Sequence, residues 1–451
     1  MNLDNFFKAK SVAIIGVSSV PAKVGHVILK NLIDAKFSGR IYPISVNGGE
    51  ILGHKVLKNV CEIKGRVDLA VIAVPAAVVL NVVKDCGKKG IKDVVMITSG
   101  FSEIGNHKLK DQLAALLTKY GIKMVGPNCL GVFDAYTKLD TLFLPRYRLT
   151  RPAPGGISFV CQSGAAGSAL LDLASKEGYG FAKFVSYGNA LNVDEADIIE
   201  YLDRDPQTKV ICLYVEGVKD GKKFVQVCKK AKKPIIAIKG GISAAGAAAT
   251  LSHTGSLAGN GAVYGGIFRQ CGIIQAHRLE DMFHYARILE KSIKPRGNRV
   301  QVITNGGGYG ILCTDAIIEN GLEMAKMDKK VLAVLKKKFP PIVTVANPMD
   351  LVGDADTERY RVALDAAVND KNVDVVLLVL LYQTPKISTD IIDVVTEYNS
   401  MKKKPIVVIS TGGEFTELLK KNLEENGVIS FTFPGQAVDA VRVLCGYYLK
   451  K

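Results

Sequence analysis

The stretch Ser11–Gly25, which reads SVAIIGVSSVPAKVG, decides the fold of the first part of the chain. Its first residues, Ser11–Ile15, predict a strand, and the residues after Gly25 predict a helix. Gly16 and Gly25 bound the turn between them, where glycines let the backbone approach a ligand. A helix N-terminus attracts anions, and Lys23 adds positive charge. The stretch therefore predicts a phosphate-binding turn, with a plain structural turn as the alternative.

The glycine spacing of this turn distinguishes it from a dinucleotide site. It does not match the G-x-G-x-x-G fingerprint, because the turn from Gly16 to Gly25 is longer. The second expected strand is also not followed directly by an acidic residue. Both observations argue against an NAD-dependent dehydrogenase.

The same strand–helix alternation continues through 451 residues, which predicts an α/β fold with parallel, doubly wound sheets. Leu142–Gly156 and Lys291–Asn298 are rich in proline, glycine or charge and are interpreted as joints. We therefore expect three consecutive domains, 1–146, 147–293 and 294–451. Their strands are expected near Ser11–Ile15, Gly39–Ile44, Leu69–Val74, Val94–Ile97, Lys123–Val125, Ile157–Cys161, Ala182–Ser186, Val210–Val215, Pro234–Ile238, Arg299–Thr304, Val373–Leu381, Pro405–Ser410 and Val428–Phe431.

Composition excludes several classes of protein. The formal net charge is +16, but the lysines are dispersed and few aromatics lie among them, so a solvated surface is favoured over nucleic-acid binding. No apolar run reaches the ~18 residues of a membrane span, and no secretory signal is evident. The nine cysteines form no CxxC pair, which favours reduced thiols and no metal site. A cytoplasmic protein is expected.

Two further glycine turns follow expected strands. One is Gln162–Gly167, where Ser163 is placed to cap a helix that begins at Gly164; the other is Asn305–Gly310, which includes Gly306 and Gly307. Each places a helix N-terminus at the carboxyl end of a strand, where open α/β sheets bind ligands. One hypothesis is that the two helix ends face a single phosphate from both sides.

His253 lies in a run of small residues. Most residues from Gly240 to Gly259 are Gly, Ala, Ser or Thr, which leaves space around the imidazole. A neutral imidazole is a good nucleophile toward phosphorus. Glu216 follows the expected strand Val210–Val215, and its carboxylate could accept a hydrogen bond from one ring nitrogen. The alternatives are a structural histidine and a solvated strand-end glutamate.

Six motifs in order carry a resemblance to a known family. Together they resemble the α subunit of NDP-forming acyl-CoA synthetases (acetyl-CoA synthetase, ADP-forming), relatives of succinyl-CoA synthetase. The resemblance extends over essentially the whole chain. The motifs are Gly16–Gly25, Ala73–Ala76, Thr98–Phe101, Pro127–Gly131, Gln162–Ala165 and Ser252–Gly255.

The resemblance implies the domain types and the site residues. It implies a Rossmann-like domain that binds coenzyme A (CoA), then two flavodoxin-like domains of the succinyl-CoA synthetase type. His253 would be the phosphorylated residue and Glu216 would steady it. Phosphate would contact Ser163, Gly164, Asn189, Gly306 and Gly307. CoA would contact Gly16, Ser18, Lys23, Asn47, Val74, Pro75, Ser99 and Asn128.

One departure from the family concerns the adenosine end of CoA. Relatives often carry a lysine after the second strand, in a Pro-x-Asn-Pro-Lys stretch. Here Pro43–Gly49 reads PISVNGG, without that lysine. Asn47 and backbone groups are the remaining candidates for this contact.

The reaction that the resemblance implies is reversible: acyl-CoA, phosphate and ADP give a carboxylic acid, ATP and CoA. It would pass through an acyl phosphate and phospho-His253. The three domains leave no room for the ATP-grasp domain that the family uses for ADP, ATP and Mg²⁺. A separate ATP-grasp β subunit in an α2β2 complex is therefore expected.

Two alternative functions would use different parts of the sequence. A non-enzymatic, regulatory CoA-binding protein would use only the first domain and would leave His253 and the later glycine turns without a role. A protein acetyltransferase of this family would need an extra domain. The sequence does not indicate which acyl group is used, nor whether ADP or GDP is preferred.

Overall fold

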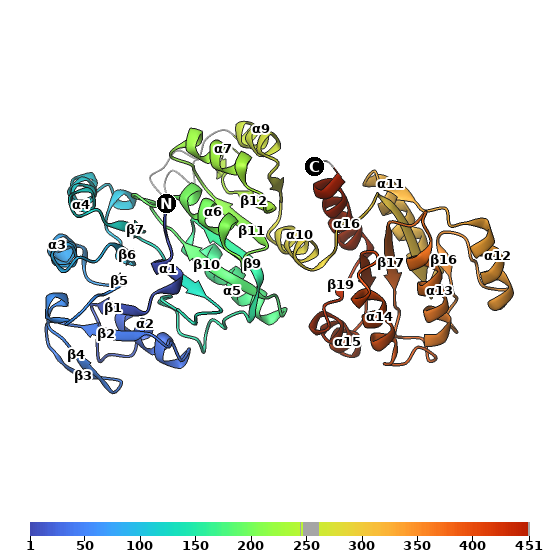
Figure 1. The fold of residues 1–451 in the computed structure, drawn as a ribbon, viewed down its shortest axis with the longest axis horizontal. Helices are drawn as coiled ribbons and strands as arrows, with labels where there is room; N and C mark the ends of the chain where they lie inside the picture. Colours follow the sequence, from blue (N-terminus) through green and yellow to red (C-terminus); the bar gives the residue numbers. More distant parts are fainter. Residues whose placement is uncertain (244, 247–260, 450–451) are drawn as a thin grey trace. The chain divides into compact units, whose positions relative to one another are not determined.

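The computed structural model describes residues 1–243, 245–246 and 261–449. They form two compact units, Met1–Leu279 and Glu280–Lys451 (Figure 1). Two parallel or mostly parallel sheets lie in the first unit and one lies in the second. The predicted α/β class with three consecutive α/β domains is confirmed. The boundaries expected at 146 and 293 stay predictions.

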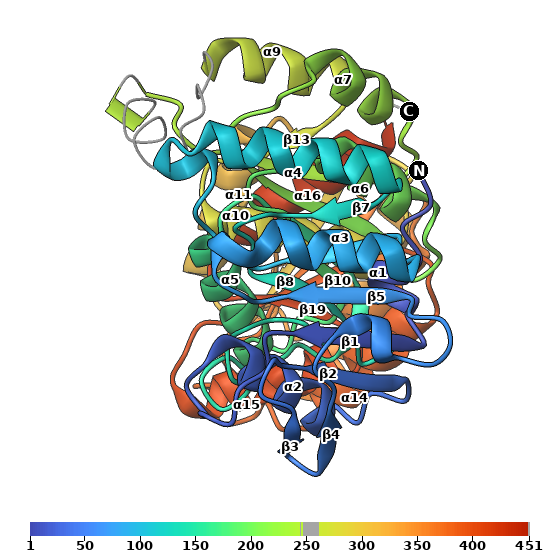
Figure 2. The same cartoon turned by 90° about the vertical axis from the view of Figure 1, so that its left-hand side faces the viewer.

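The first sheet is parallel, with the order β2-β1-β5-β6-β7. Its strand β1 (Ser11–Ile15), which the opening stretch predicts, lies between β2 and β5. Val12 and Ile14 lie in the core toward the second sheet, whereas Ala13 and Ile15 pack under α3 and α4, which cover the other face (Figure 2). The elements are α1 (Asn5–Lys8), α2 (Val24–Asp34), β2 (Arg40–Ile44), β3 (Gly49–Ile51), β4 (His54–Val56), β5 (Leu69–Ile72), α3 (Val79–Lys89), β6 (Asp93–Met96), α4 (His107–Tyr120) and β7 (Lys123–Val125).

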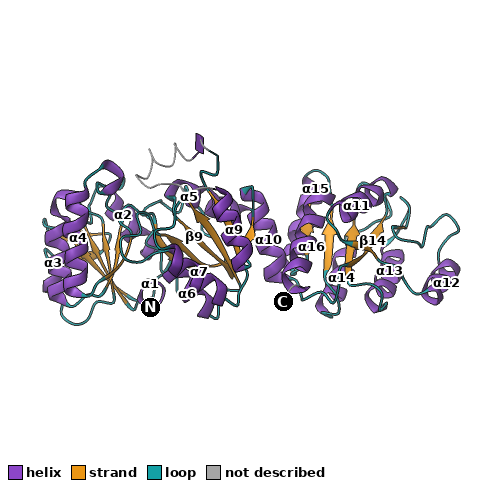
Figure 3. Ribbon diagram, turned by 90° about the horizontal axis from the view of Figure 1, so that it is seen from above, coloured by secondary structure: helices purple, strands orange, loops and turns teal. Residues whose placement is uncertain are grey.

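The second sheet has the order β13-β12-β11-β9-β10-β8 and is parallel except for β8, which runs antiparallel to β10. Helices lie on both sides of its strands (Figure 3). Its elements are β8 (Gly131–Asp134), β9 (Pro154–Cys161), α5 (Gly164–Lys176), β10 (Phe181–Ser186), α6 (Glu195–Arg204), β11 (Val210–Val215), α7 (Gly221–Lys230), β12 (Ile235–Lys239), α9 (Gly261–Cys271) and β13 (Ile274–Gln275).

The strand β8 joins the two sheets of the first unit. It follows the last strand of the first sheet along the chain, but it pairs with β10 in the second sheet. A short buried strand has no periodicity that identifies its partner, so β8 is not predictable from the sequence alone. One continuous core contains residues from both sheets, among them Val12 and Ile211. This shared core explains why both sheets belong to one compact unit.

The segment Leu142–Gly156, interpreted as a joint, is held by buried contacts within the first unit. Arg151 lies buried and its Nε is 2.9 Å from Asp140 Oδ2. The side chain of Asn31 on α2 donates hydrogen bonds to the carbonyls of Leu142 (2.7 Å) and Leu144 (3.0 Å). Up to residue 153 the segment has no helix or strand, and side chains from elsewhere hold its irregular backbone in place, whereas Pro154 already begins β9.

The third sheet, in the second unit, has the order β15-β14-β17-β18-β19, and β16 also pairs with β14. All of its pairings are parallel. Its elements are α10 (Leu279–Lys291), β14 (Arg299–Thr304), α11 (Gly307–Glu319), β15 (Glu323–Met324), α12 (Lys329–Lys338), β16 (Met349–Asp350), α13 (Thr357–Asn369), β17 (Val375–Val379), α14 (Ile391–Ser400), β18 (Ile406–Ile409), α15 (Glu414–Glu425), β19 (Ile429–Phe431) and α16 (Pro434–Leu449).

The helix α10 is tied to this unit by buried charge. Glu424 accepts hydrogen bonds from Arg287 and, at 2.8 Å, from Lys291. Burial alone would raise the pKa of Glu424, but the two cations hold that pKa below its usual value. None of the helices in the described ranges has the length and apolar character that a membrane crossing requires.

A candidate active site at the ends of six strands

A cavity of about 560 Å³ lies in the first unit, at the carboxyl ends of strands from both sheets. The first sheet contributes the residues after β5, β6 and β7, and the second contributes those after β9, β10 and β11. This is the edge at which parallel sheets bind ligands. Eight of the predicted site residues line the cavity: Val74, Pro75, Ser99, Asn128, Ser163, Gly164, Asn189 and Glu216.

The wall from the first sheet is built by three consecutive turns. Thr98 donates through its hydroxyl to the carbonyl of Val74 (2.7 Å), and the N–H of Asn128 donates to the carbonyl of Thr98 (2.9 Å). These bonds connect the segments that follow β5, β6 and β7. The four predicted CoA contacts on this wall, including Pro75 and Ser99, therefore belong to one connected surface.

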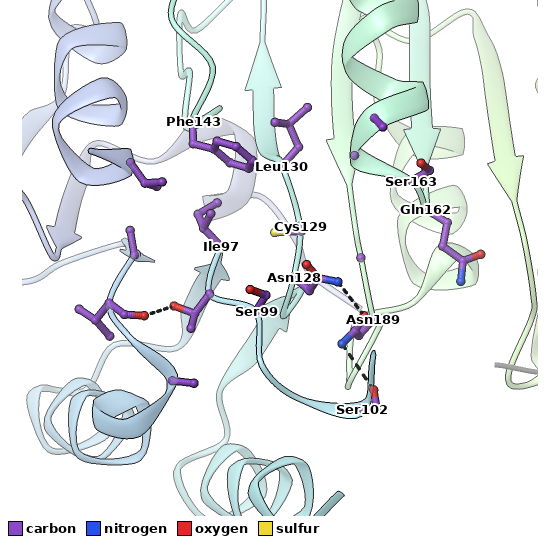
Figure 4. A pocket seen from close by; sticks show the side chains of 18 of the residues that line it. Ile97, Ser99, Ser102, Asn128, Cys129, Leu130, Phe143, Gln162, Ser163 and Asn189 are labelled. Atoms are coloured by element: carbon purple, nitrogen blue, oxygen red, sulfur yellow. Dashed lines mark hydrogen bonds between the residues drawn. The ribbon is translucent and has the colours of Figure 1, made fainter. Parts of the chain in front are cut away.

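The wall from the second sheet begins at the N-terminus of α5. Ser163 caps the helix, since its hydroxyl accepts from the N–H of Ala166 (3.3 Å), as predicted. Gly164 and Ala165 also line the cavity, so the first residues of the helix carry no large side chain of their own at this end. Uncapped N–H groups at a helix N-terminus are good anion ligands. This part of the cavity is therefore suited to phosphate (Figure 4).

Glu216 is buried next to this helix end, with 7% of its surface exposed. The backbone N–H groups of Glu216 and Gly217 both donate to Oε1 of Gln162, at 2.7 and 3.1 Å. Burial and then the negative charge of Glu216 raise the pKa of Tyr214, which hydrogen-bonds that carboxylate, to about 12. Glu216 thus occupies a defined position in the cavity wall. His253, its predicted partner, lies outside the described residues.

Asn189 stands where the two walls meet. Its Nδ2 donates to Glu103 Oε2 (2.6 Å), and its Oδ1 lies 3.4 Å from Nδ2 of Asn128. Lys219, which also lines the cavity, donates to the backbone carbonyls of Asn189 and Ala190. Asn189 is therefore held by both sheets at once.

Cys129 lines the cavity with a buried thiol. Its side chain is buried, and burial raises the pKa of its thiol to about 12. The thiol donates weakly to the carbonyl of Met96, at 3.3 Å. A neutral thiol is a poorer nucleophile than a thiolate, which argues against a catalytic role for Cys129.

Four predicted CoA residues lie around or beyond the β1–α2 turn and do not line this cavity: Gly16, Ser18, Lys23 and Asn47. Ser18 accepts a hydrogen bond from the N–H of Val20 (3.1 Å), Lys23 is the exposed residue before α2, and Asn47 is exposed after β2. Gly16 lies against the end of β5, beside Ala73 and Val74, which do line the cavity. The turn thus adjoins one rim of the cavity.

Replacing Gly16 by alanine should weaken CoA binding and lower stability. Gly16 has φ +103°, and a Cβ there would lie 2.3 Å from the carbonyl oxygen of Ala73. The turn must shift, which we expect to destabilise the protein by about 1–3 kcal/mol and to raise the Kd for CoA. Calorimetric titration with CoA and urea unfolding measure the two effects. Gly105→Ala has a positive φ but open space around its Cβ, and it should leave CoA binding unchanged.

Gly306 and Gly307 lie in the second unit, at the N-terminus of α11. Gly306 is the residue before the helix, and its N–H donates to the hydroxyl of Thr304 (2.9 Å). A Cβ on Gly307 would lie 2.8 Å from Oδ2 of Asp350. The predicted strand–turn–helix order is confirmed here, while a shared phosphate between the glycine turns stays a prediction.

Three residues of the cavity region were missed as functional candidates. Gln162 belongs to a recognised motif, but only the fold shows that its side chain supports Glu216. Lys219 lies a few residues after the carboxyl end of β11. Its position near a strand end was the only sequence feature that could have marked it as a site residue. Glu103 precedes α4 and has no sequence signal of its own, because Asn189, its partner across the cavity, is distant in sequence.

Comparison with known proteins agrees with the fold. Models of three families match in order: a CoA binding domain over residues 10–135, a succinyl-CoA ligase like flavodoxin domain over 154–289, and a Ligase-CoA domain over 300–449. Their order defines a CoA ligase of the succinyl-CoA ligase type.

Individual relatives indicate which kind of CoA ligase this chain is similar to. The acetate–CoA ligase [ADP-forming] I subunit alpha of Pyrococcus furiosus is 41% identical, over 98% of this chain and 97% of that protein. The acetate–CoA ligase [ADP-forming] of Methanocaldococcus jannaschii is 39% identical, over 98% of this chain and 63% of the relative. The structure of a Ca. Korarchaeum cryptofilum dinucleotide forming acetyl-coenzyme A synthetase 1 in complex with phosphate and ADP has a TM-score of 0.93 and 34% identity, covering 100% of this chain and 98% of that one.

This chain belongs to the family of the α subunits of ADP-forming acetate–CoA ligases. The prediction of an NDP-forming acyl-CoA synthetase, an acid–thiol ligase, is confirmed by these relatives, and a purely regulatory CoA-binding protein is not favoured. The order of the three matched domains is also the order of the predicted domains.

Proposed function

We propose that this chain binds CoA and phosphate in the cavity of the first unit and forms the acyl phosphate there. The observation that carries this proposal is the meeting of two predicted sites in one cavity. Val74, Pro75 and Ser99 line it from one sheet, and Ser163 and Glu216 line it from the other. A thioester carried by CoA along the first wall therefore reaches the anion-binding end of α5.

The chemistry begins with phosphate as the nucleophile. Its oxygen attacks the thioester carbonyl, the C–S bond breaks, and acyl phosphate and CoA result. The N-terminus of α5, through Ser163 and Gly164, orients the phosphate and stabilises its charge. Asn189 contributes one more hydrogen-bond donor at the junction of the walls. This assignment of residues follows from the cavity geometry and the resemblance together.

His253 then takes the phosphoryl group from the acyl phosphate and releases the carboxylic acid. Its imidazole attacks phosphorus, and the bond between phosphorus and the acyl oxygen breaks. Glu216 stabilises the imidazole by accepting a hydrogen bond from the other ring nitrogen. An oxygen of the terminal phosphate of ADP finally attacks the phosphorus of phosphohistidine, and the N–P bond breaks to give ATP; Mg²⁺ at the nucleotide would neutralise charge on the phosphates.

A β subunit completes the enzyme in this proposal. The Pyrococcus furiosus relative of nearly equal length is named a subunit alpha, and the Methanocaldococcus jannaschii relative is a longer single chain. We propose that the partner carries an ATP-grasp domain that binds ADP, ATP and Mg²⁺, in an α2β2 complex. Gel filtration with multi-angle light scattering of the co-expressed subunits tests this composition, and separate elution would contradict it.

The test of the reaction uses the co-expressed complex with acetyl-CoA, labelled phosphate and ADP·Mg²⁺. We expect labelled ATP and stoichiometric release of CoA. The α subunit alone, given acetyl-CoA and labelled phosphate, should acquire acid-labile protein label. A complex that binds CoA but yields neither ATP nor protein label with acetyl-CoA or other acyl-CoA substrates would contradict the proposed reaction.

A further inference from the structure

The carboxylate of Glu103 connects the two walls of the cavity. It lies on the short turn Ser102–Ile104, between β6 and α4. Its Oε1 accepts from the backbone N–H groups of Gly100 (2.5 Å) and Phe101 (3.1 Å), and its Oε2 accepts from Nδ2 of Asn189 (2.6 Å). One side chain from the first sheet thus orders both the turn after Ser99 and a side chain of the second sheet.

Glu103 is ionised in this environment. Burial by itself would raise the pKa of the carboxyl group, but hydrogen bonds from Gly100 and Asn189, among others, hold it below the usual value. An ionised carboxylate accepts hydrogen bonds and donates none. The group that faces it must therefore be the NH₂ of Asn189 rather than its carbonyl oxygen.

The backbone around Asn189 is held in place, so the side-chain amide has few positions open to it. The N–H of Asn189 donates to the carbonyl of Pro127 (3.0 Å), and Lys219 holds its carbonyl. Gly188 and Ala190 both have positive φ, at +53° and +47°. A Cβ on Gly188 would lie 2.2 Å from the carbonyl oxygen of Asn128, so the two turns are in tight contact. What remains open is the direction of the terminal amide.

We propose that Glu103 is a positioning residue that directs Asn189 toward phosphate, an inference that rests on the proposed function. Glu103 takes one hydrogen of the Asn189 NH₂ group. Among the described residues, the other hydrogen has only a long contact with the hydroxyl of Ser102 (3.4 Å), which also lines the cavity (Figure 4). An arriving phosphate oxygen can replace that weak contact and receive a well-oriented donor.

The first test is Glu103→Gln in the complex with the β subunit. The glutamine oxygen can still accept from Gly100 and Phe101, but its NH₂ then faces the NH₂ of Asn189 and forces that amide to turn over. Loss of a charge-assisted hydrogen bond should raise the KM for phosphate about tenfold or more. The KM for acyl-CoA should change less than about twofold, because the turn after Ser99 keeps its bonds.

The second test separates positioning from structural support. In the double variant Glu103→Gln, Asn189→Asp, the glutamine NH₂ donates to the new carboxylate, so the contact between the walls returns. Tm should recover toward the wild-type value, whereas the KM for phosphate should stay raised because a carboxylate now faces the anion. If the KM recovers together with Tm, the pair is only structural and the inference is wrong.

Two controls distinguish a failure of this inference from a failure of the proposed reaction. Glu177→Gln removes an exposed carboxylate after α5 and should leave both KM values unchanged. Equilibrium dialysis of the complexes with labelled inorganic phosphate repeats the comparison without turnover. Phosphate binding that weakens in Glu103→Gln supports the inference even if the wild-type complex forms no ATP, an outcome that contradicts only the proposed reaction. Unchanged phosphate binding and KM in Glu103→Gln, or no phosphate binding by the wild type, overturns the inference.

Discussion

Replacing His253 by alanine should abolish ATP formation by the complex, with a loss of about four orders of magnitude or more. The reason is chemical: the proposed route needs a nucleophile that accepts the phosphoryl group from the acyl phosphate and later releases it to ADP. The methyl side chain of alanine has no lone pair and cannot accept the phosphoryl group. The measurement is labelled ATP formed from acetyl-CoA, labelled phosphate and ADP, together with acid-labile label on the α subunit.

The variant should retain the first half of the reaction. Phosphate attacks the thioester before His253 acts, so CoA release and its exchange back into acetyl-CoA should continue at the cavity. His107→Ala is a matched control, since His107 is an exposed histidine at the start of α4, and it should behave like the wild type. Acid-labile label on His253→Ala at the wild-type level would show that another residue is phosphorylated.

Replacing Lys183 by methionine should lower the free energy of unfolding by about 3–5 kcal/mol. The Nζ of Lys183 on β10 lies 3.2 Å from Asp134 on β8 and 2.8 Å from Asp205 after α6. All three side chains are buried, with 0%, 0% and 1% exposed. Methionine matches the length of the lysine stem but removes the charge, which leaves two carboxylates buried without their cation.

Urea unfolding measures this effect as a fall in the midpoint at constant m value. Lys176→Met, at a side chain that is 80% exposed on α5, is the matched control and should change stability by less than about 0.5 kcal/mol. Adding Asp134→Asn and Asp205→Asn to Lys183→Met should recover part of the loss, because the uncompensated charges are then removed. A loss below about 1 kcal/mol for Lys183→Met would contradict the role of the buried cation.

Much of the fold was predictable because its signals are local. The run Ser11–Ile15 forms β1 with the predicted bounds, and Ser163 caps α5 as its position before Gly164 predicted. Strand patterns and helix caps depend on neighbours within a few residues. The residues of the cavity walls were predictable for a related reason, since each follows the end of a strand and parallel strands end at a common edge.

The contacts that complete the site were not predictable in this way. The strand β8 was missed because its place depends on β10, some fifty residues further along the chain. Arg151 was assigned to a linker, yet its charge lies buried beside Asp140. Glu103 carries no motif, and its bond to Asn189 joins residues 86 positions apart.

By itself the sequence determined the α/β class, the order of three domains and the family, and it predicted which residues meet phosphate and CoA. These properties follow from local periodicity, glycine turns and ordered motifs. Only the tertiary structure decided that two sheets share one core, that Glu216 is supported by Gln162, and that Glu103 and Lys219 hold Asn189 between the walls. Such contacts form between residues that are distant in sequence, and their partners become defined only when burial brings the elements together.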